Sequence, residues 1–215
     1  DRTVHFTDHE TGGNGAWLNS GGAFVPSTGT VTFTGAAATI AGTTNFTNMI
    51  INSGADITPQ TDSIIRIGGT VTNSGTWRSA ILANTIDYYG SSQTVLNPNG
   101  GTPGYYHLIL SGSGTKTMPG TAMSISGNFT MSGTASATAL ASSNTTGTFT
   151  IGSGTSFTTG AFTHQIGGGF SNSGTFTATG STITLNGSSS QSMSGATSFN
   201  NLTLNNSAGL TISNN

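Results

Sequence analysis

The ionisable side chains of this chain are concentrated at its start, where six of the fourteen occur within ten residues. Imidazole and carboxylate groups are ligands that zinc and similar ions accept. His5 and His9 would share one face of a helix, but residues 3–7 alternate polar and apolar side chains, as a strand does. We therefore predict no metal site and interpret the segment as a polar terminal strand or cap. The six residues are Asp1, Arg2, His5, Asp8, His9 and Glu10.

Two further histidines stand apart from other ionisable residues. His107 occupies the position that Asn48 and Asn201 take in similar segments, which indicates a ladder or turn residue. His164 lies in the sequence Phe-Thr-His-Gln-Ile, where we expect it to point outward. Neither histidine has a carboxylate neighbour in the sequence, so we predict no catalytic role for either.

The remaining charged residues are scattered singly. Asp62 and Arg66, with Arg78 nearby, could meet on one face, where we expect a structural ion pair or plain solvent exposure. Enzymes that cleave acidic polysaccharides need clustered acids and bases. We therefore predict no enzymatic activity, no catalytic residue and no cofactor.

Composition excludes several classes of protein. Only 5% of the 215 residues are charged, against about 25% in ordinary soluble domains. Four lysine and arginine residues cannot cover a nucleic-acid backbone, and no apolar run approaches the ~20 residues of a membrane helix. The absence of cysteine excludes disulfide scaffolds and thiolate chemistry. An uncharged, hydroxyl-rich chain remains, and this composition favours a secreted structural protein over an enzyme.

Internal repeats determine the predicted architecture. Residues 31–58 align with residues 183–212, so that Gly35 coincides with Gly187 and the Phe-x-x-apolar-x-apolar spacing recurs. A looser copy starts at Ile86. Each copy has too few large apolar residues to bury itself, so the copies must stack to complete a core.

Within each copy, apolar and polar residues alternate, as in Val31 and Phe33 or Ile183 and Leu185. This period of two, bounded by Gly, Asn and Ser, is the pattern of a half-buried strand. The fold predicted is all-β: a right-handed parallel β-helix, or β-solenoid, with strands of about 3–5 residues and coils of roughly 20 residues. We expect one continuous solenoid domain over residues 17–215, preceded by the terminal strand or cap in residues 1–16.

The alternation also predicts which side chains stack inward. The expected core residues are Val31, Phe33, Ile40, Phe46, Met49, Ile51, Leu108, Leu110, Phe129, Phe170, Ile183, Leu185, Phe199, Leu202 and Leu204. Thr, Ser and Asn at the other positions would form hydrogen-bonded ladders, which stacked like charges would not.

The repeated phrase, Val-Thr-Phe-Thr-Gly at residues 31–35 followed by Ile-Ala-Gly-Thr-Thr-Asn-Phe at residues 40–46, resembles the β-solenoid repeats of large bacterial secreted and cell-surface proteins. These are adhesin, autotransporter-passenger and filamentous-haemagglutinin-like proteins. The resemblance covers residues 17–215. It implies an extracellular parallel β-helix used as a stalk, fibre or adhesive surface, and it supplies no catalytic motif.

Two tyrosine pairs are candidates for contact with surface glycans, because outward aromatic rings can stack on sugars. By alternation, one tyrosine of each pair faces the core and the other faces outward. The pairs are Tyr88 with Tyr89, and Tyr105 with Tyr106.

The C-terminal phrase ends without an evident cap, and we expect it to leave an open strand edge. Either the natural chain continues beyond residue 215, or a strand near Val4 and Phe6 of another copy covers this edge, giving a head-to-tail contact that propagates rather than closes. The partner expected is therefore the chain itself, in an extracellular filament or surface fibre. The expected interface residues are Val4, Phe6, Leu202, Leu204, Leu210 and Ile212.

Other functions stay open. One is an adhesin or carbohydrate-binding stalk of a larger surface protein. Another is an ice-binding solenoid, suggested by Thr-x-Thr triplets at residues 30–32 and 182–184, although irregular coil lengths count against a regular threonine array. A polysaccharide-degrading β-helix enzyme is disfavoured by the scattered charges.

Overall fold

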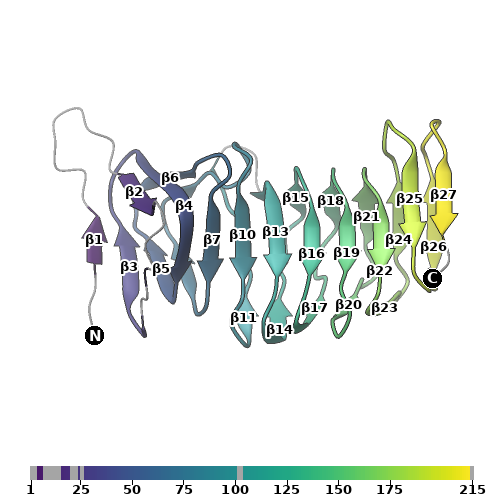
Figure 1. The fold of residues 1–215 in the computed structure, drawn as a ribbon, viewed down its shortest axis with the longest axis horizontal. Helices are drawn as coiled ribbons and strands as arrows, with labels where there is room; N and C mark the ends of the chain where they lie inside the picture. The colour runs from purple at the N-terminus through teal and green to yellow at the C-terminus, as the bar shows by residue number, and fades with distance from the viewer. Residues whose placement is uncertain (1–3, 7–15, 20–23, 25–26, 101–103, 214–215) are drawn as a thin grey trace.

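The computed structural model describes residues 4–6, 16–19, 24, 27–100 and 104–213. Its described part contains strands and turns but no helix. Figure 1 shows short strands arranged side by side in rows along one long axis, with β1 (Val4–Phe6) at one end and β27 (Leu210–Ser213) at the other. The chain is thus an all-β parallel β-solenoid of about nine turns.

Four sheets form the faces of the solenoid, and the pairs at their strand registers are parallel. The four-stranded sheet contains β1, β3 (Thr30–Phe33), β5 (Asn48–Ile51) and β8 (Val71–Asn73). The five-stranded sheet contains β11 (Gln93–Thr94), β14 (Ser113–Thr117), β17 (Thr134–Thr138), β20 (Ser156–Thr158) and β23 (Thr175–Thr177). The six-stranded sheet contains β12 (Gly104–Tyr105), β15 (Met123–Ile125), β18 (Ser143–Thr145), β21 (Thr163–Ile166), β24 (Thr182–Leu185) and β26 (Asn201–Leu204).

The twelve-stranded sheet runs the length of the solenoid. It contains β2 (Ala16–Asn19), β4 (Ala38–Phe46), β6 (Asp56–Pro59), β7 (Ile64–Ile67), β9 (Thr76–Trp77), β10 (Thr85–Tyr88), β13 (His107–Leu110), β16 (Phe129–Met131), β19 (Phe149–Ile151), β22 (Phe170–Asn172), β25 (Gln191–Ser194) and β27. Strand β4 turns a corner, because residues 38–40 pair with β6 and residues 43–46 pair with β7.

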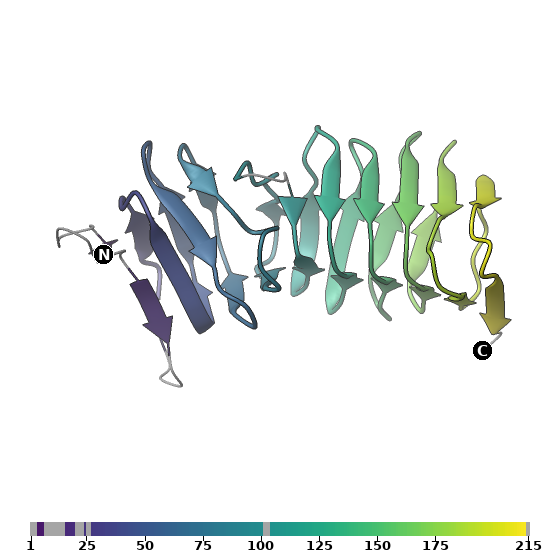
Figure 2. The ribbon, with the colours of Figure 1, turned by 90° about the horizontal axis from the view of Figure 1, so that it is seen from above.

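Strand register confirms the predicted coil length. Ile86, Leu108, Phe129, Phe149 and Phe170 pair in succession, so the turns between them contain 22, 21, 20 and 21 residues. Figure 2 shows the same regular stacking of coils from above. The right-handed coiling stays a prediction.

The two aligned repeats, residues 31–58 and 183–212, each cover one full turn and part of the next, and the three copies start on different sheets. Residues 31–58 start in the four-stranded sheet, where Val31 pairs with Met49 one turn later. The copy at Ile86 starts in the twelve-stranded sheet, and residues 183–212 start in the six-stranded sheet. The repeat therefore specifies a coil without specifying which face the coil begins on.

The core fills the space inside the coils. Twelve of the fifteen predicted inward residues are buried, from Val31 to Leu185. Phe199 is only half-buried. Leu202 and Leu204 continue the inward stacks of the buried Ile183 and Leu185 as predicted, but their expected burial is wrong, because they are 42% and 51% exposed. Among the described residues, β26 is the last strand of its sheet and pairs with β24 alone.

Strand β1 continues the four-stranded sheet, because Val4 and Phe6 pair in register with Val31 and Phe33. Residues 7–15, between β1 and β2, lie outside the described residues. The division of the chain into residues 1–16 and 17–215 therefore stays a prediction.

Candidate functional site

The arginines form structural ion pairs, but with partners other than those expected. Nε of Arg66 donates to Oδ2 of Asp87 at 2.9 Å, across paired positions of β7 and β10. The hydroxyl of Ser111 donates to the other carboxylate oxygen at 2.5 Å. The guanidinium carbon of Arg66 lies 4.7 Å from the centre of the Tyr89 ring, as a cation–π pair does. Asp87 is nearly buried, and both of its oxygens accept hydrogen bonds.

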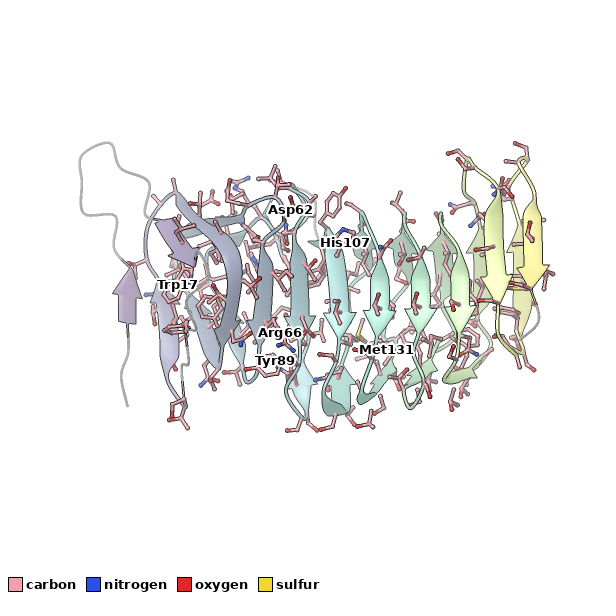
Figure 3. The ribbon with its side chains drawn as sticks, viewed as in Figure 1. Trp17, Asp62, Arg66, Tyr89, His107 and Met131 are labelled. Carbon is pink, nitrogen blue, oxygen red and sulfur yellow. The ribbon has the colours of Figure 1, made fainter. Side chains whose placement is uncertain are left out.

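The second ion pair joins neighbouring coils in the same way. Nε and the terminal nitrogen of Arg78 donate to the two oxygens of Asp56 at 2.7 and 2.6 Å, which raises the pKa of Arg78. Asp62 sits in an exposed turn with a φ of 60°. Figure 3 shows Asp62 well separated from Arg66 and Tyr89, so Asp62, Arg66 and Arg78 do not form the shared site considered from the sequence.

Lys116 is the least expected feature of the interior. It lies on β14 between two exposed threonines, and its side chain is fully buried. Its Nζ donates to the carbonyl oxygen of Gly90 at 2.6 Å and to Oε1 of Gln93 at 2.7 Å. Burial lowers the pKa of Lys116 to about 8, and the negative charge of Asp87 opposes part of that change.

Gln93 belongs to a bracket that occurs twice in the solenoid. Its Nε2 donates to the carbonyls of Ile67 and Gly69, and its Oε1 accepts from the backbone N–H of Gly90. We call this arrangement the glutamine bracket. In this way Gln93 links Gly90, which lies at the corner after β10, to Ile67 and Gly69 in the preceding coil.

Gln191 forms the second glutamine bracket. Its Nε2 donates to the carbonyls of Ile166 and Gly168, and its Oε1 accepts from the N–H of Gly187. The buried amide of Asn206 donates to Oε1 of Gln191 at 2.9 Å, as Lys116 does to Gln93. The glutamine bracket was not predicted, although the sequence carries a signal for it: both copies read Gly, two or three Ser, then Gln.

The tyrosine pairs divide as alternation predicts. Tyr88 and Tyr105 are fully buried and their hydroxyls lie 3.0 Å apart, so they are the core-facing member of each pair and are not available to glycans. Burial raises the pKa of Tyr88 to about 12 and that of Tyr105 well above its usual value. Tyr89 and Tyr106 are half-buried, and glycan contact by these two stays a prediction.

The ladder role predicted for His107 is confirmed. Its Nδ1 accepts a hydrogen bond from the backbone N–H of Asn128, one coil further on, at 2.9 Å. Oδ1 of Asn128 accepts in turn from the N–H of Thr148, and Oδ1 of Asn48 accepts from the N–H of Thr70. Histidine thus replaces asparagine as an acceptor between coils. Desolvation lowers the pKa of His107, which favours the neutral ring that can accept.

The outward orientation predicted for His164 is wrong. Its ring is 1% exposed, because His164 shares strand parity with the buried Ile166. Its Nδ1 lies 2.8 Å from the hydroxyl of Ser143, and its Nε2 lies 2.8 Å from the carbonyl oxygen of Thr159. Burial lowers the pKa of His164, and the hydrogen bond to Thr159 opposes that change.

The C-terminal coil presents apolar side chains to solvent. Leu202, Leu204 and Ile212 are 42%, 51% and 61% exposed, while Leu210 is half-buried. Within the described part of the chain, strand β1 at the other end of the solenoid pairs with β3 alone. The side chains of Val4 and Phe6 lie outside the described residues, and a subunit interface at these two ends stays a prediction.

The ionisable N-terminal cluster of residues 1–10 also lies outside the described residues, apart from the backbone of β1. Among the described residues, no three His, Asp or Glu side chains come together in a way that could hold a metal ion. No helix in the described part is long and apolar enough to cross a membrane.

Fold and surface together define the class of protein: a parallel β-solenoid with hydrogen-bonded polar side chains in its interior and exposed apolar side chains on its last described coil. No family model, curated protein or solved structure matches the chain.

Proposed function

We propose that this chain is an extracellular structural protein, in which β-solenoids stack end to end to form a filament or surface fibre. The observation that carries the proposal is the exposure of Leu202, Leu204 and Ile212 in the last described coil. Leu202 and Leu204 lie in register with the buried Ile183 and Leu185, so one further coil of parallel strands would bury them in the same way. A coil from a second copy supplies that cover.

Strand order supports a head-to-tail contact. In the regular coils, a strand of the twelve-stranded sheet is followed by one of the five-stranded sheet, as β13 is by β14 and β16 by β17. The five-stranded sheet adjoins the four-stranded sheet across a groove lined by Thr72 of β8 and Thr94 of β11. Because β27 belongs to the twelve-stranded sheet and β1 to the four-stranded sheet, β1 of a neighbour occupies the next place in the coil.

The remaining chemistry supports a structural role over a catalytic one. Arg66 and Arg78 pair with carboxylates, and Lys116 and His164 are buried with hydrogen-bond partners.

The proposed head-to-tail contact is heterologous and propagates, so it forms a filament rather than a closed ring. An extracellular stalk or fibre of the adhesin or filamentous-haemagglutinin-like kind, as the repeats suggest, agrees with such an assembly.

Analytical ultracentrifugation and negative-stain electron microscopy of the 215-residue chain test the proposal. We expect concentration-dependent filaments of constant width that persist at high salt, because charge contributes little to the contact. Leu204→Lys places a charge on the open edge and should give monomers. Leu140→Lys is the matched control, because Leu140 is 47% exposed but lies away from both ends. Removal of residues 1–10 should also give monomers or short oligomers.

A monomeric chain at high concentration contradicts the proposal. Filaments formed equally well by the Leu204→Lys variant contradict it too, since the C-terminal coil would then not be the contact.

A further inference from the structure

The five-stranded sheet presents two columns of hydroxyl side chains to solvent. Its strands carry a Ser or Thr on either side of one inward residue, such as Lys116, Ala137 or Phe157. The first column contains Thr115, Ser136, Ser156 and Thr175. The second column contains Thr94, Thr117, Thr138, Thr158 and Thr177. We call this surface the threonine face.

The threonines of the second column pair with one another on every neighbouring pair of strands, without a shift in register. Thr94 pairs with Thr117, Thr117 with Thr138, Thr138 with Thr158, and Thr158 with Thr177. The corresponding coils differ in length, with 23, 21, 20 and 19 residues between successive threonines. The loops between sheets absorb these differences. The irregular coil lengths that argued against an ordered threonine array therefore do not disturb it.

The hydroxyl groups of the second column are available to solvent. None of these five threonine hydroxyls makes a hydrogen bond to another group in the described part of the chain. Four of the five residues are exposed, and Thr158 is half-buried. Threonine is β-branched, so its side chain on a strand holds few rotamers and keeps the hydroxyl and methyl groups at fixed places.

The threonine face carries neither charge nor outward aromatic rings. The chain contains no Asp, Glu, Lys or Arg after Lys116, whose own charge points inward. The aromatic residues of these strands, Phe157 and Phe176, lie on the inward side. Sugar recognition usually draws on aromatic rings or charged groups, whereas this face offers only hydroxyl and methyl groups at regular intervals.

From this geometry we propose that the threonine face binds the surface of crystalline water. Neighbouring strands place equivalent hydroxyls about 4.8 Å apart, and residues two apart on one strand lie about 6.6 Å apart. Oxygen atoms in hexagonal ice repeat at comparable distances in two directions. Water held by the hydroxyls, and ordered around the methyl groups between them, can therefore join the lattice with little further loss of entropy. The proposal does not depend on filament formation.

Growth of a single ice crystal in a supercooled solution of the purified chain tests the proposal. We expect faceted crystals and a gap between the melting and growth temperatures, together with enrichment of the chain in a slowly growing ice phase. Thr138→Lys, in the middle of the second column, should reduce that gap at least tenfold. Thr117→Lys provides a second exposed position in the same column, in case one variant folds poorly.

Thr163→Lys is the matched control. Thr163 is exposed and lies on β21, the strand after β20, but it belongs to the six-stranded sheet. Circular dichroism verifies that all variants fold. Wild-type chain that neither shapes ice nor partitions into it overturns the proposal. Equal loss in the Thr163→Lys control, or binding to crystalline cellulose without binding to ice, overturns it as well.

Discussion

Lys116 donates a hydrogen bond from Nζ to Oε1 of Gln93 at 2.7 Å, and both side chains are buried within the solenoid. Its other acceptor is the carbonyl oxygen of Gly90. A neutral amine has two N–H donors, which match these two acceptors, whereas an ammonium group has a third that must also be satisfied. The site therefore favours the neutral lysine, in agreement with the pKa of about 8.

This pKa predicts a stability that increases with pH. The unfolded chain holds the lysine proton up to about pH 10.4, whereas the folded chain releases it near pH 8. Because the unfolded state binds more protons between these values, the free energy of unfolding rises through that window and falls again as the pH is lowered. Urea denaturation at about pH 7, 8.5 and 9.5 should show the rise in midpoint. Lys116→Met should abolish it, and an unchanged slope in that variant would assign the effect to other groups.

The second glutamine bracket should be a strong determinant of stability. Gln191→Leu leaves two carbonyls, a backbone N–H and the amide of Asn206 without their partner. Each buried group left unpaired costs about 1–3 kcal/mol, so we expect a loss of at least about 2 kcal/mol after local rearrangement. Gln165→Leu, at an exposed position of β21, should change stability by less than about 0.5 kcal/mol. Chemical denaturation of both variants decides between a structural bracket and an incidental contact.

Coil length, strand alternation and most of the core were predictable from the sequence, because they follow from local periodicity. Which sheet each repeat begins on was not predictable. Val31, Ile86 and Ile183 open similar phrases, yet they lie on three different sheets. The phrase encodes a turn of the coil, while its starting face depends on how many residues the preceding loops contain.

The hydrogen-bond partners of the polar interior could not be predicted from the sequence. Alternation gives His164 the parity of the buried Ile166 and Lys116 that of the buried Met118, so it indicates an inward direction but not what satisfies an imidazole or an amine there. Their hydrogen-bond partners Ser143 and Gln93 lie 21 and 23 residues away in sequence. Only the stacking of coils brings those partners within reach. The exposure of Leu204 likewise depends on the place of β26 as the last strand of its sheet among the described residues, not on its own strand pattern.

The buried His164 predicts a loss of stability in acid. Its pKa is lowered by burial, so the unfolded chain takes up the proton at a higher pH than the folded chain. Stability is therefore fully present above about pH 6.5 and decreases as the pH falls through the folded-state value. The pKa of His107 is lowered in the same direction. The measurement is the stability as a function of pH in two variants. The first carries His107→Asn, which replaces His107 by the asparagine found at that position in the other repeats. The second carries His107→Asn together with His164→Met. A flat profile in the double variant is expected, and an unaltered acid transition would exclude His164 as its source.

Glycines at some corners of the coils let the backbones of neighbouring coils approach closely. Gly112 has a φ of +72°, and a Cβ there would collide with the carbonyl oxygen of Tyr89 in the preceding coil. Backbone cannot move aside as a side chain can, so Gly112→Ala should destabilise the chain by more than the 1–2 kcal/mol of conformational strain alone. Gly54→Ala measures the conformational strain without a collision, because the φ of Gly54 is +84° but no atom lies within 4 Å of the added Cβ.

Gly120 completes the comparison, because its Cβ would also meet open space and its φ is not in the left-handed region. Gly120→Ala should be neutral or slightly stabilising, since alanine restricts the unfolded chain. Thermal unfolding of the three variants should rank them with Gly112→Ala lowest, Gly54→Ala intermediate and Gly120→Ala at or above the wild type. Equal midpoints for Gly112→Ala and Gly54→Ala would mean that neighbouring coils are not packed as closely at this corner as the contact with Tyr89 requires.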